Sequence, residues 1–406
     1  MICLVTFSYA QSSCYSELKG DTLTIGNRLV ERKFVWNGGN LMTYSLCDKV
    51  NGKTNLTASL MPDFVILKDA KSGMDGTCQV EKVMATDIHP AYLRTVVTFS
   101  LGPLDIRRIY RIYDDCPAIA CDTYLKGTVN SVFGGRDENA ADRKNIEFAE
   151  DMKSKSVTAV LDQLNFKGQH WHAKAVEFWD VTDWNNNLVA ERDVITYRKN
   201  NYRGNLFFVR NGEDNSGFFF LKEAPCSSVQ LAYNGVDFMA EFGKFMVTGL
   251  GITEKDIQQD EWIRTYGCVT GVYGGGKLQA LTALRNYQKN TRRHFRDRDE
   301  MIMMNTWGDR SQDSKVNEAF CLQELERMSR LGVTHFQIDD GWQTGKSPNS
   351  AVAKGSFKNI WDNKDYWKPD KKKYPRGLSP IVKKGKELGI EIGLWFNPSV
   401  QNDFAD

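Results

Sequence analysis

The first two thirds of the chain consist of short apolar runs separated by turn-forming residues. The runs RTVVTFSL, IRRIYRIY, GNLFFVRN and SGFFFLKE are rich in β-branched and aromatic residues. Gly, Asn, Asp and Pro separate such runs at short intervals, as expected for strands joined by tight turns. Because so many short strands follow one another, residues 11–276 are predicted to form a large antiparallel β-sandwich.

The spacing of the apolar positions changes after residue 276. Residues 277–294 contain no Gly or Pro, and they place Leu278, Leu281, Leu284 and Tyr287 about one helical turn apart. This spacing predicts a helix. We assign residues 277–296 as a helix that links the sandwich to the segment that follows.

Residues 297–406 alternate between strand and helix patterns. Three apolar runs are predicted strands, the first of them buried: MIMMN at 301–305, VTHFQI at 333–338 and IEIGLWF at 390–396. The first predicted helix covers residues 314–331. The second begins at Ser379, its predicted cap, with Pro380 at the first helical position, and Gly389 ends it.

This order of elements, without hairpin turns, predicts parallel strands with right-handed crossovers. Such units occur in open doubly wound sheets and in (β/α)8 (TIM) barrels. No Gly-rich phosphate loop follows any of the three strands, which argues against a nucleotide-binding sheet. The predicted fold is therefore an N-terminal antiparallel β-sandwich followed, in residues 297–406, by the first three β/α units of a (β/α)8 barrel.

The sequence HFQIDDGWQ, residues 335–343, places Asp339 and Asp340 directly after the second predicted strand. Residues just beyond a parallel strand lie at the carboxyl edge of the sheet, where active sites are built. Trp307 and Trp395 stand at or just beyond the ends of the other two strands. All four side chains are therefore expected to converge on one mouth.

Two adjacent carboxylates allow several kinds of chemistry. A hard cation needs more oxygen ligands than the neighbouring residues offer, and adjacent Asp side chains point in different directions, which disfavours a facing acid–base pair. Hydrogen bonding to ligand hydroxyls, with Trp rings stacked on the apolar face of a sugar, fits best. The structural alternatives are that Asp-Asp-Gly is only a turn and that each Trp is a core residue.

Composition changes this picture little. Aromatic residues make up 12% of the chain, which suits flat sugar faces but also suits strands. The net charge of +2 gives no reason to expect nucleic acid or an anionic membrane as a partner, and no stretch reaches the ~18 apolar residues of a membrane span. Nine cysteines without a C-x-x-C pair disfavour a zinc site, and no metal or cofactor is expected. Export would permit a Cys116–Cys121 bridge, but most thiols are expected to be free and buried.

The N-terminus predicts export. Residues 2–7 are mostly apolar, and Ser8 and Ala10 stand at the −3 and −1 positions of a possible cleavage site. Residues 1–10 are therefore predicted to be the remnant of a signal peptide, with the protein in the periplasm or outside the cell. The positively charged front of a signal is missing, which suggests that Met1 is not the natural start. A first β-strand is the alternative.

Four motifs in order resemble the start of the catalytic barrel of glycoside hydrolase family 36, the α-galactosidase-like enzymes. They are NTW (305–307), DDGW (339–342), DYWKPDKKKYPRGL (365–378) and GLWFNP (393–398). The β-rich residues 11–276 are similar to that family's N-terminal sandwich in architecture only. The resemblance implies an exo-acting, retaining hydrolase of terminal α-linked galactose in oligosaccharides or polysaccharides, with a possible homo-oligomeric assembly.

The resemblance also implies site roles. Asp339 and Asp340 would bind the galactose hydroxyls in the −1 subsite, and Trp307, Trp367 and Trp395 would shape the pocket; Trp342 is the weaker candidate. Two departures put the exact sugar in question. Tyr366 stands where the family usually has Asp, and Asn397, Pro398 and Ser399 stand where it usually has EPE.

The resemblance places the nucleophile in a Lys-x-Asp motif after a fourth strand and the acid/base after a sixth. Both are thus expected beyond Asp406, the barrel is predicted to be truncated, and the chain as given is predicted to be inactive. Two alternatives stay open for the function. One is a relative with other specificity, an α-N-acetylgalactosaminidase or a raffinose-synthase-like transferase; the other is a non-catalytic carbohydrate-binding protein that uses the sandwich.

Overall fold

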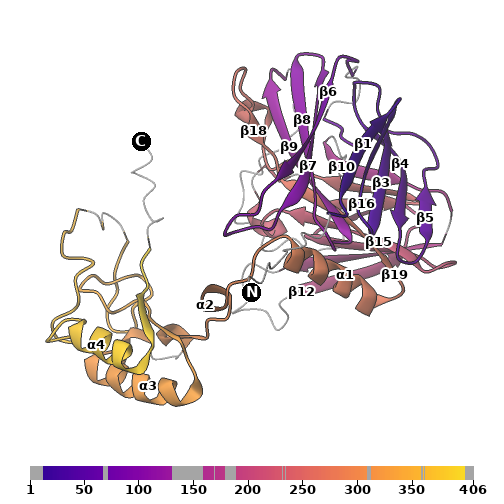
Figure 1. The fold of residues 1–406 in the computed structure, drawn as a ribbon. Helices are drawn as coiled ribbons and strands as arrows, with labels where there is room; N and C mark the ends of the chain where they lie inside the picture. Colours follow the sequence, from indigo (N-terminus) through magenta and orange to yellow (C-terminus); the bar gives the residue numbers. More distant parts are fainter. Residues whose placement is uncertain are drawn as a thin grey trace, which may run out of the picture. The chain divides into compact units, whose positions relative to one another are not determined.

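The computed structural model describes residues 12–66, 72–129, 159–168, 170–178, 189–230, 232–233, 235–308, 312–357, 360 and 362–397. The chain divides into two compact units, Met1–Arg293 and His294–Asp406 (Figure 1). The predicted signal remnant, residues 1–10, lies outside the described residues, as do Pro398, Ser399 and Asp406.

The described residues of the first unit form three antiparallel sheets (Figure 1). One has the order β1-β2-β3-β4-β5: β1 (Tyr15–Lys19), β2 (Thr22–Gly26), β3 (Val30–Val35), β4 (Met42–Asp48) and β5 (Lys53–Leu56). A second has the order β10-β17-β16-β13: β10 (Val160–Asn165), β17 (Lys244–Thr248), β16 (Phe238–Glu241) and β13 (Asn200–Tyr202).

The third sheet has the order β12-β11-β14-β15-β19-β9-β8-β7-β6, with β18 paired to β9. Its strands are β6 (Thr77–Val83), β7 (Tyr92–Leu101), β8 (Leu104–Ile112), β9 (Ala118–Gly127), β11 (Trp171–Phe178), β12 (Val189–Ile195), β14 (Leu206–Asn211), β15 (Ser216–Glu223), β18 (Ile263–Arg264) and β19 (Gly267–Gly274). One hydrophobic core draws on all three sheets, with Leu23, Ile106 and Phe245 as fully buried members. The antiparallel, strand-rich first unit agrees with the prediction.

Strand β8 carries one arginine on its otherwise apolar buried face. Every second residue from Leu104 to Ile112 is buried, as a half-buried strand requires. The buried set includes Arg108, whose side chain is fully inaccessible, whereas Ile109 lies on the less buried face. Arg108 is tolerated on the buried face because carboxylates neutralise it.

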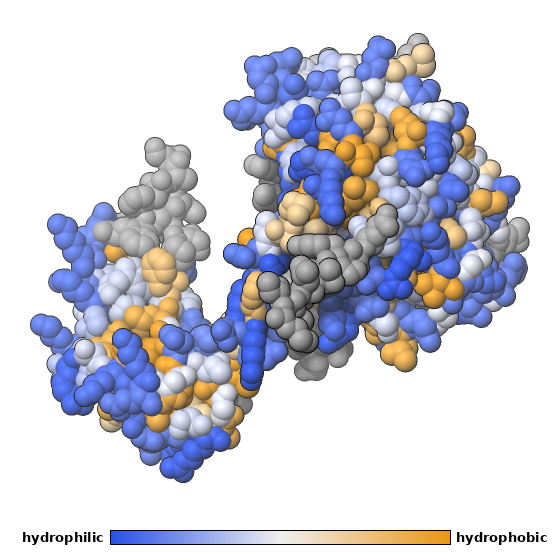
Figure 2. Space-filling view, viewed as in Figure 1, coloured by the Kyte–Doolittle hydropathy of each residue, from blue (hydrophilic) through white to orange (hydrophobic). Residues whose placement is uncertain are grey.

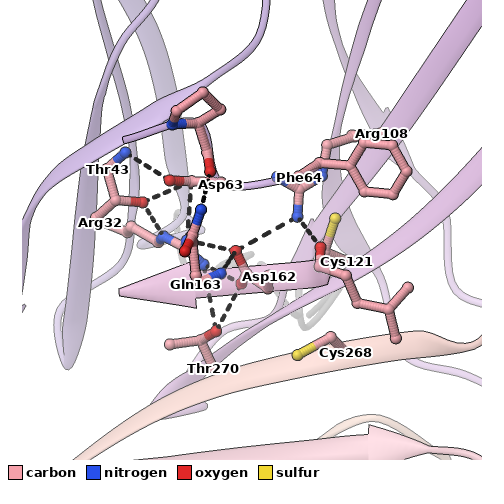
Figure 3. Close-up of polar contacts among 12 residues, drawn as sticks. Arg32, Thr43, Asp63, Phe64, Arg108, Cys121, Asp162, Gln163, Cys268 and Thr270 are labelled. Carbon is pink, nitrogen blue, oxygen red and sulfur yellow. Dashed lines mark hydrogen bonds and ion pairs between the residues drawn. The ribbon is translucent and has the colours of Figure 1, made fainter. Parts of the chain in front are cut away.

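Arg32 on β3 is the centre of the buried ionic network in Figure 3. Its Nη1 and Nη2 donate to the two carboxylate oxygens of Asp162 at 2.7 and 2.8 Å, and Nη2 also donates to Asp63 Oδ2 at 2.9 Å. Thr43 Oγ1 accepts from Arg32 Nε at 2.8 Å. Arg108 Nη2 lies 3.5 Å from Asp162 Oδ1. The four charged side chains are at most 1% exposed, so each depends on its partners.

The network joins the three sheets. Arg32 belongs to the five-stranded sheet, Asp162 on β10 to the four-stranded sheet, and Arg108 on β8 to the ten-stranded sheet. Thr270 on β19 adds a hydroxyl that donates to Asp162 Oδ2 at 3.2 Å. The charges therefore fix how the sheets pack as well as occupying their core.

Helix α1 (Lys277–Asn290) covers part of the outer face of the ten-stranded sheet. Its buried residues are Ala280, Ala283, Leu284 and Tyr287. The helix that the spacing predicts is present, but Leu278 and Leu281 are 73% and 43% exposed. The small alanines let the helix approach the sheet closely, and this determines which face is buried.

The described part of the second unit contains three parallel strands: β20 (Met303–Asn305), β21 (His335–Ile338) and β22 (Glu391–Leu394). Helix α3 (Glu318–Leu331) lies between the first two in sequence and α4 (Ser379–Leu388) between the last two; a short helix, α2 (Arg296–Asp299), precedes them. The predicted order and parallel direction of the strands are thus present. Cys321, Leu325 and Met328 of α3 pack with Phe336 and Ile381 in the core of this unit.

Three details of the second unit differ from the prediction. The strand at 301–305 is not buried, because β20 is an edge strand of the described sheet; Met301, Ile302 and Met303 are 51%, 54% and 52% exposed. Hydrophobic surface is visible on this unit in Figure 2. Helix α3 begins at Glu318, where Asn317 caps it by accepting from Phe320 N at 3.0 Å. Ser379 is the first residue of α4 and not its cap.

The eight cysteines in the described part of the chain are free thiols. Cys116 and Cys121 pack in different buried clusters, so the bridge that export would permit is not formed. No helix within the described residues is long and apolar enough to cross a membrane.

We predict that Asp162→Ala will cost roughly 3–5 kcal/mol of stability, because it leaves Arg32 and Arg108 buried without their shared counter-charge. Glu81→Ala is the control, since Glu81 pairs with Arg94 at the surface of the same unit, and surface pairs contribute about 1 kcal/mol or less. Urea unfolding of the full chain measures both. Equal losses in the two variants would show that the network is not a stabilising core.

A second prediction concerns pH. Burial raises the pKa of Asp63 from 3.8 to about 6, against the opposing attraction of Arg32. Since the folded pKa lies above the unfolded one, the contribution of Asp63 to stability is fully present below about pH 4 and is lost as pH rises through about 6. Asp63→Asn removes this term. The stability of the parent should therefore fall relative to that of the variant between pH 4 and 7 in urea titrations; a constant difference would contradict the assignment.

Candidate functional site

The candidate site lies where β20 and β21 end. The two strands run parallel with Asn305 opposite Gln337, and β21 pairs with β22 through Ile338 opposite Leu394. The residues that follow these positions therefore leave the sheet at the same edge. Asp339 and Asp340 come directly after β21, as the sequence predicted.

Asp339 is held by Asn305 on β20, by Thr306 just after β20, and by the next residue, Asp340. Asn305 Nδ2 donates to Asp339 Oδ2 at 2.7 Å, and the amide N–H of Asp340 donates to Oδ1 at 2.7 Å. The backbone N–H of Asp339 donates to Thr306 Oγ1 at 2.9 Å. Asp339 is 8% exposed, so its carboxylate is fixed in orientation before any ligand arrives.

Asp340 is turned into the loop that follows it. Gln343 Nε2 donates to its Oδ1 at 2.6 Å, and the Ser347 hydroxyl donates to its Oδ2. Asp340 is 4% exposed, and both of these partners are fully or almost fully buried. A carboxylate oxygen can accept two hydrogen bonds, so each oxygen keeps one acceptor position. Ligand binding by Asp340 stays a prediction.

Gly341 makes the turn between these acids and the loop possible. Its φ is +107°, and a Cβ here would lie 2.0 Å from the Cβ of Asp313. Lys373 Nζ donates to the backbone carbonyls of Asp313 at 2.6 Å and of Gly341 at 3.0 Å. Burial lowers the pKa of Lys373. Only glycine fits this position without displacing its neighbours.

The long loop after β21 folds back on itself. Thr344 N donates to Lys368 O at 2.7 Å, and Gly345 N donates to Tyr366 O at 3.0 Å. Asp370 N donates to Trp342 O at 3.0 Å. These bonds bring the DYWKPD segment beside the DDGW segment, a pairing that the sequence did not predict.

This pairing gathers aromatic rings. The ring centroid of Trp367 lies 6.2 Å from that of Trp342, 6.1 Å from that of Trp395 and 5.0 Å from that of Tyr366. Trp342 Nε1 donates to the carbonyl of Trp395 at 2.8 Å. Trp342 is 5% exposed and packs in the core of the unit, while Trp367 and Trp395 are partly exposed.

Trp307 is placed differently. It lies on the short helical turn Thr306–Gly308 after β20, and its backbone N–H donates to Asn305 Oδ1 at 2.6 Å. Within the described residues, no ring contact joins it to the other indoles. The structure thus brings together Trp367 and Trp395 with Trp342. Among the described residues, Asn305 links Trp307 to Asp339.

Two donors in the aromatic cluster lack partners. Tyr366 OH and Trp367 Nε1 are buried, and neither has a hydrogen-bond partner among the described residues. Burial raises the pKa of Tyr366, and the nearby Asp340 carboxylate adds to the increase. A buried unpaired donor costs about 1–3 kcal/mol, so a hydroxyl oxygen of a ligand or another part of the protein would stabilise this corner.

Sequence reasoning missed the residues that orient the acids. Gln343 stands three positions after Asp340 within the same motif, a spacing that could have suggested a side-chain contact. Asn305 lies within the NTW motif but was not singled out. Ser347 meets Asp340, and Asp313 and Lys373 meet Gly341, only in the folded protein, so no local pattern indicates them. In the described part of the chain, no group of three or more His, Cys, Asp or Glu residues could hold a metal ion.

Comparison with known proteins finds relatives of this chain among α-galactosidases. Residues 266–405 match the family model described as Melibiase. An α-galactosidase of Escherichia coli is 37% identical over 90 residues, which are 22% of this chain and 11% of that protein. The α-galactosidase AgaA of Geobacillus stearothermophilus is 29% identical over 106 residues, 26% of this chain and 13% of that protein.

Solved structures cover more of the chain. The GH36 α-galactosidase AgaB of Geobacillus stearothermophilus has a TM-score of 0.59 at 14% identity, over 95% of this chain and 57% of that one. The galactosidase domain of AgaSK has a TM-score of 0.61 at 11% identity, again over 95% and 57%. At these identities the likeness concerns the fold, and this chain spans little more than half the length of those structures. The resemblance to GH36 α-galactosidases that the four motifs predicted is confirmed.

We predict that Gly341→Ala will disturb the site more than Gly332→Ala. Both glycines have positive φ, but a Cβ at Gly332 would meet nothing within 4 Å. The control should cost about 1–2 kcal/mol of backbone strain, and Gly341→Ala should cost roughly 1–3 kcal/mol more from overpacking. Hydrogen exchange of the 339–347 amides and urea unfolding measure the two effects. Unchanged exchange at 339–347 in Gly341→Ala would rule out the tight turn.

Proposed function

We propose that this protein is an α-galactosidase that hydrolyses terminal α-linked galactose with retention of configuration. The observation that carries the proposal is the position of Asp339 and Asp340, which follow the second parallel strand within the segment that matches the Melibiase model. Acids at the carboxyl edge of such strands are where barrel enzymes bind substrate.

The proposed ligand is the terminal galactose of an oligosaccharide. Structures of AgaA variants were determined in complex with raffinose and with stachyose, and the same sugars are the first candidates for this protein. Asp339 and Asp340 accept hydrogen bonds from the sugar hydroxyls in this proposal. Trp367 and Trp395 contribute the aromatic wall, and Trp307 closes the side of the pocket next to Asn305.

The reacting groups lie outside these residues in the proposal. A retaining glycosidase needs two carboxylates about 5 Å apart, and the resemblance assigns them to later strands of the barrel, beyond Asp406. The described part of the second unit holds three parallel strands, whereas a complete barrel has eight. Residues 305–395 would then bind and orient the sugar without performing bond cleavage.

Sugar specificity, export and assembly complete the proposal. Tyr366 offers a phenol where the family usually has a carboxylate, so α-N-acetylgalactosaminides belong in the substrate panel beside α-galactosides. Export is supported by the pattern of residues 1–10. A homo-oligomer is supported by the family resemblance.

We expect the protein expressed from its complete gene to hydrolyse p-nitrophenyl α-galactoside and raffinose. Asp340→Asn should lower kcat/KM by a factor corresponding to roughly 2–4 kcal/mol, because it removes a charged hydrogen-bond acceptor. Asp365→Asn is the matched control in the same long loop, since Asp365 is exposed and pairs only with neighbouring Lys368 among its described ion pairs. Its kcat/KM should stay within about twofold.

Two outcomes would contradict the proposal. Absence of α-galactosidase activity in the complete protein would remove the function. Full activity in a folded Asp340→Asn protein would remove Asp340 from the substrate site and leave it a residue of the loop.

A further inference from the structure

A pocket of about 560 Å³ opens on the outer face of the ten-stranded sheet, in the first unit. It lies where the cover provided by α1 ends, between the first turns of that helix and strands β11, β12, β14 and β19. Its volume is within the range of small-molecule sites. All the residues that line it belong to one unit, and none of them takes part in the candidate sugar site.

Strand register gives the pocket two different ends. His172 on β11 lies opposite Arg210 on β14, and Val176, four residues after His172, lies opposite Leu206. Residues two apart on a strand point to the same face. One end of the pocket is therefore basic and the other is apolar. Phe178, at the apolar end, is 40% exposed.

Three cationic side chains, those of Lys174, Lys277 and Arg210, line the pocket. Lys174 Nζ and Lys277 Nζ lie 3.4 and 3.3 Å from the carboxylate of Glu191. Arg210 Nη1 donates to Asn215 Oδ1 at 2.7 Å. Because the Asn215 side chain is neutral, this hydrogen bond does not balance the charge of Arg210. Glu191 is the one carboxylate among the described residues that line the pocket.

The floor does not suit a sugar. Val176, Leu206 and Phe208 are buried apolar residues, and Tyr273, which could offer a hydroxyl, donates that hydroxyl to the carbonyl of Val209 at 2.9 Å. A saccharide would leave most of its hydroxyls unpaired on such a surface, at a cost for each. A ligand with an apolar body and one anionic group would match both the apolar and the basic end of the pocket.

We propose that this pocket binds an amphipathic anion, with its carboxylate or sulfate beside Lys174, Lys277 and Arg210 and its alkyl chain over Val176, Leu206 and Phe208. This proposal does not depend on the proposed glycosidase function. Its affinity comes from apolar burial, and the charges select an anionic headgroup over a neutral one.

Calorimetry of the full chain with octanoate, below micelle-forming concentrations, tests the proposal. One saturable site is expected, with octyl glucoside bound at least tenfold more weakly because it shares the chain but lacks the charge. Binding of octanoate should weaken as salt is raised, since ions screen the headgroup attraction. No saturable octanoate binding, or equal affinity for octyl glucoside, would overturn the proposal.

Helix α1 offers two matched pairs of variants. Leu281→Glu puts a carboxylate on the pocket wall, and Lys277→Glu reverses a charge at the basic end; each should weaken octanoate binding at least tenfold. Leu278→Glu and Lys289→Glu make the same changes at exposed positions of the same helix outside the pocket lining, and each should leave binding within twofold. All four positions are exposed, so unfolding temperatures should stay close to that of the parent. Equal weakening within each pair would overturn the assignment to this pocket.

Discussion

The second unit depends on one constraint: parallel strands bring the residues that follow them to a single edge. Asn305 ends β20 and Asp339 follows β21, and the amide of the first donates to the carboxylate of the second at 2.7 Å. The two residues are 34 positions apart, so proximity in the sequence does not bring them together. The hydrogen bond exists because β20 and β21 are in register. The position of the acids is thus a property of the sheet.

The first unit differs in that its core contains buried charged side chains. Asp162 receives a bidentate contact from Arg32 and a further charge from Arg108. Moving such groups out of water is costly, and only close pairing with satisfied hydrogen bonds offsets the cost. The geometry is specific in return: the guanidinium of Arg32 has to meet a carboxylate from another sheet at a fixed angle. Sheets held only by apolar contacts could slide more easily.

Local patterns predicted the elements well and the side-chain environments less well. The order of strands and helices in the second unit follows from the periodicity of the apolar residues and from two glycines. Gly332 and Gly389 each end a helix in the left-handed conformation. The burial of Arg108 and the exposure of Leu278 do not follow, because both depend on what packs opposite. The contacts of Asp340 with Ser347 and of Trp367 with Trp395 likewise need the folded loop. Acids and indoles could be named in advance, but not the residues that hold them.

In the proposed function, Asp340 is a loop residue and a ligand residue at the same time. Gln343 and Ser347 each take one acceptor position on its carboxylate, which fixes the side chain and leaves the remaining positions free to accept from a ligand. Much of the cost of removing this anion from water is therefore met during folding, before a sugar arrives. A ligand hydroxyl then meets an acceptor that needs little further ordering, which is the advantage of a preorganised site. In the proposed function the buried contacts of Asp340 would therefore help sugar binding, because the Asp-Asp-Gly turn and its partners hold the acid in place.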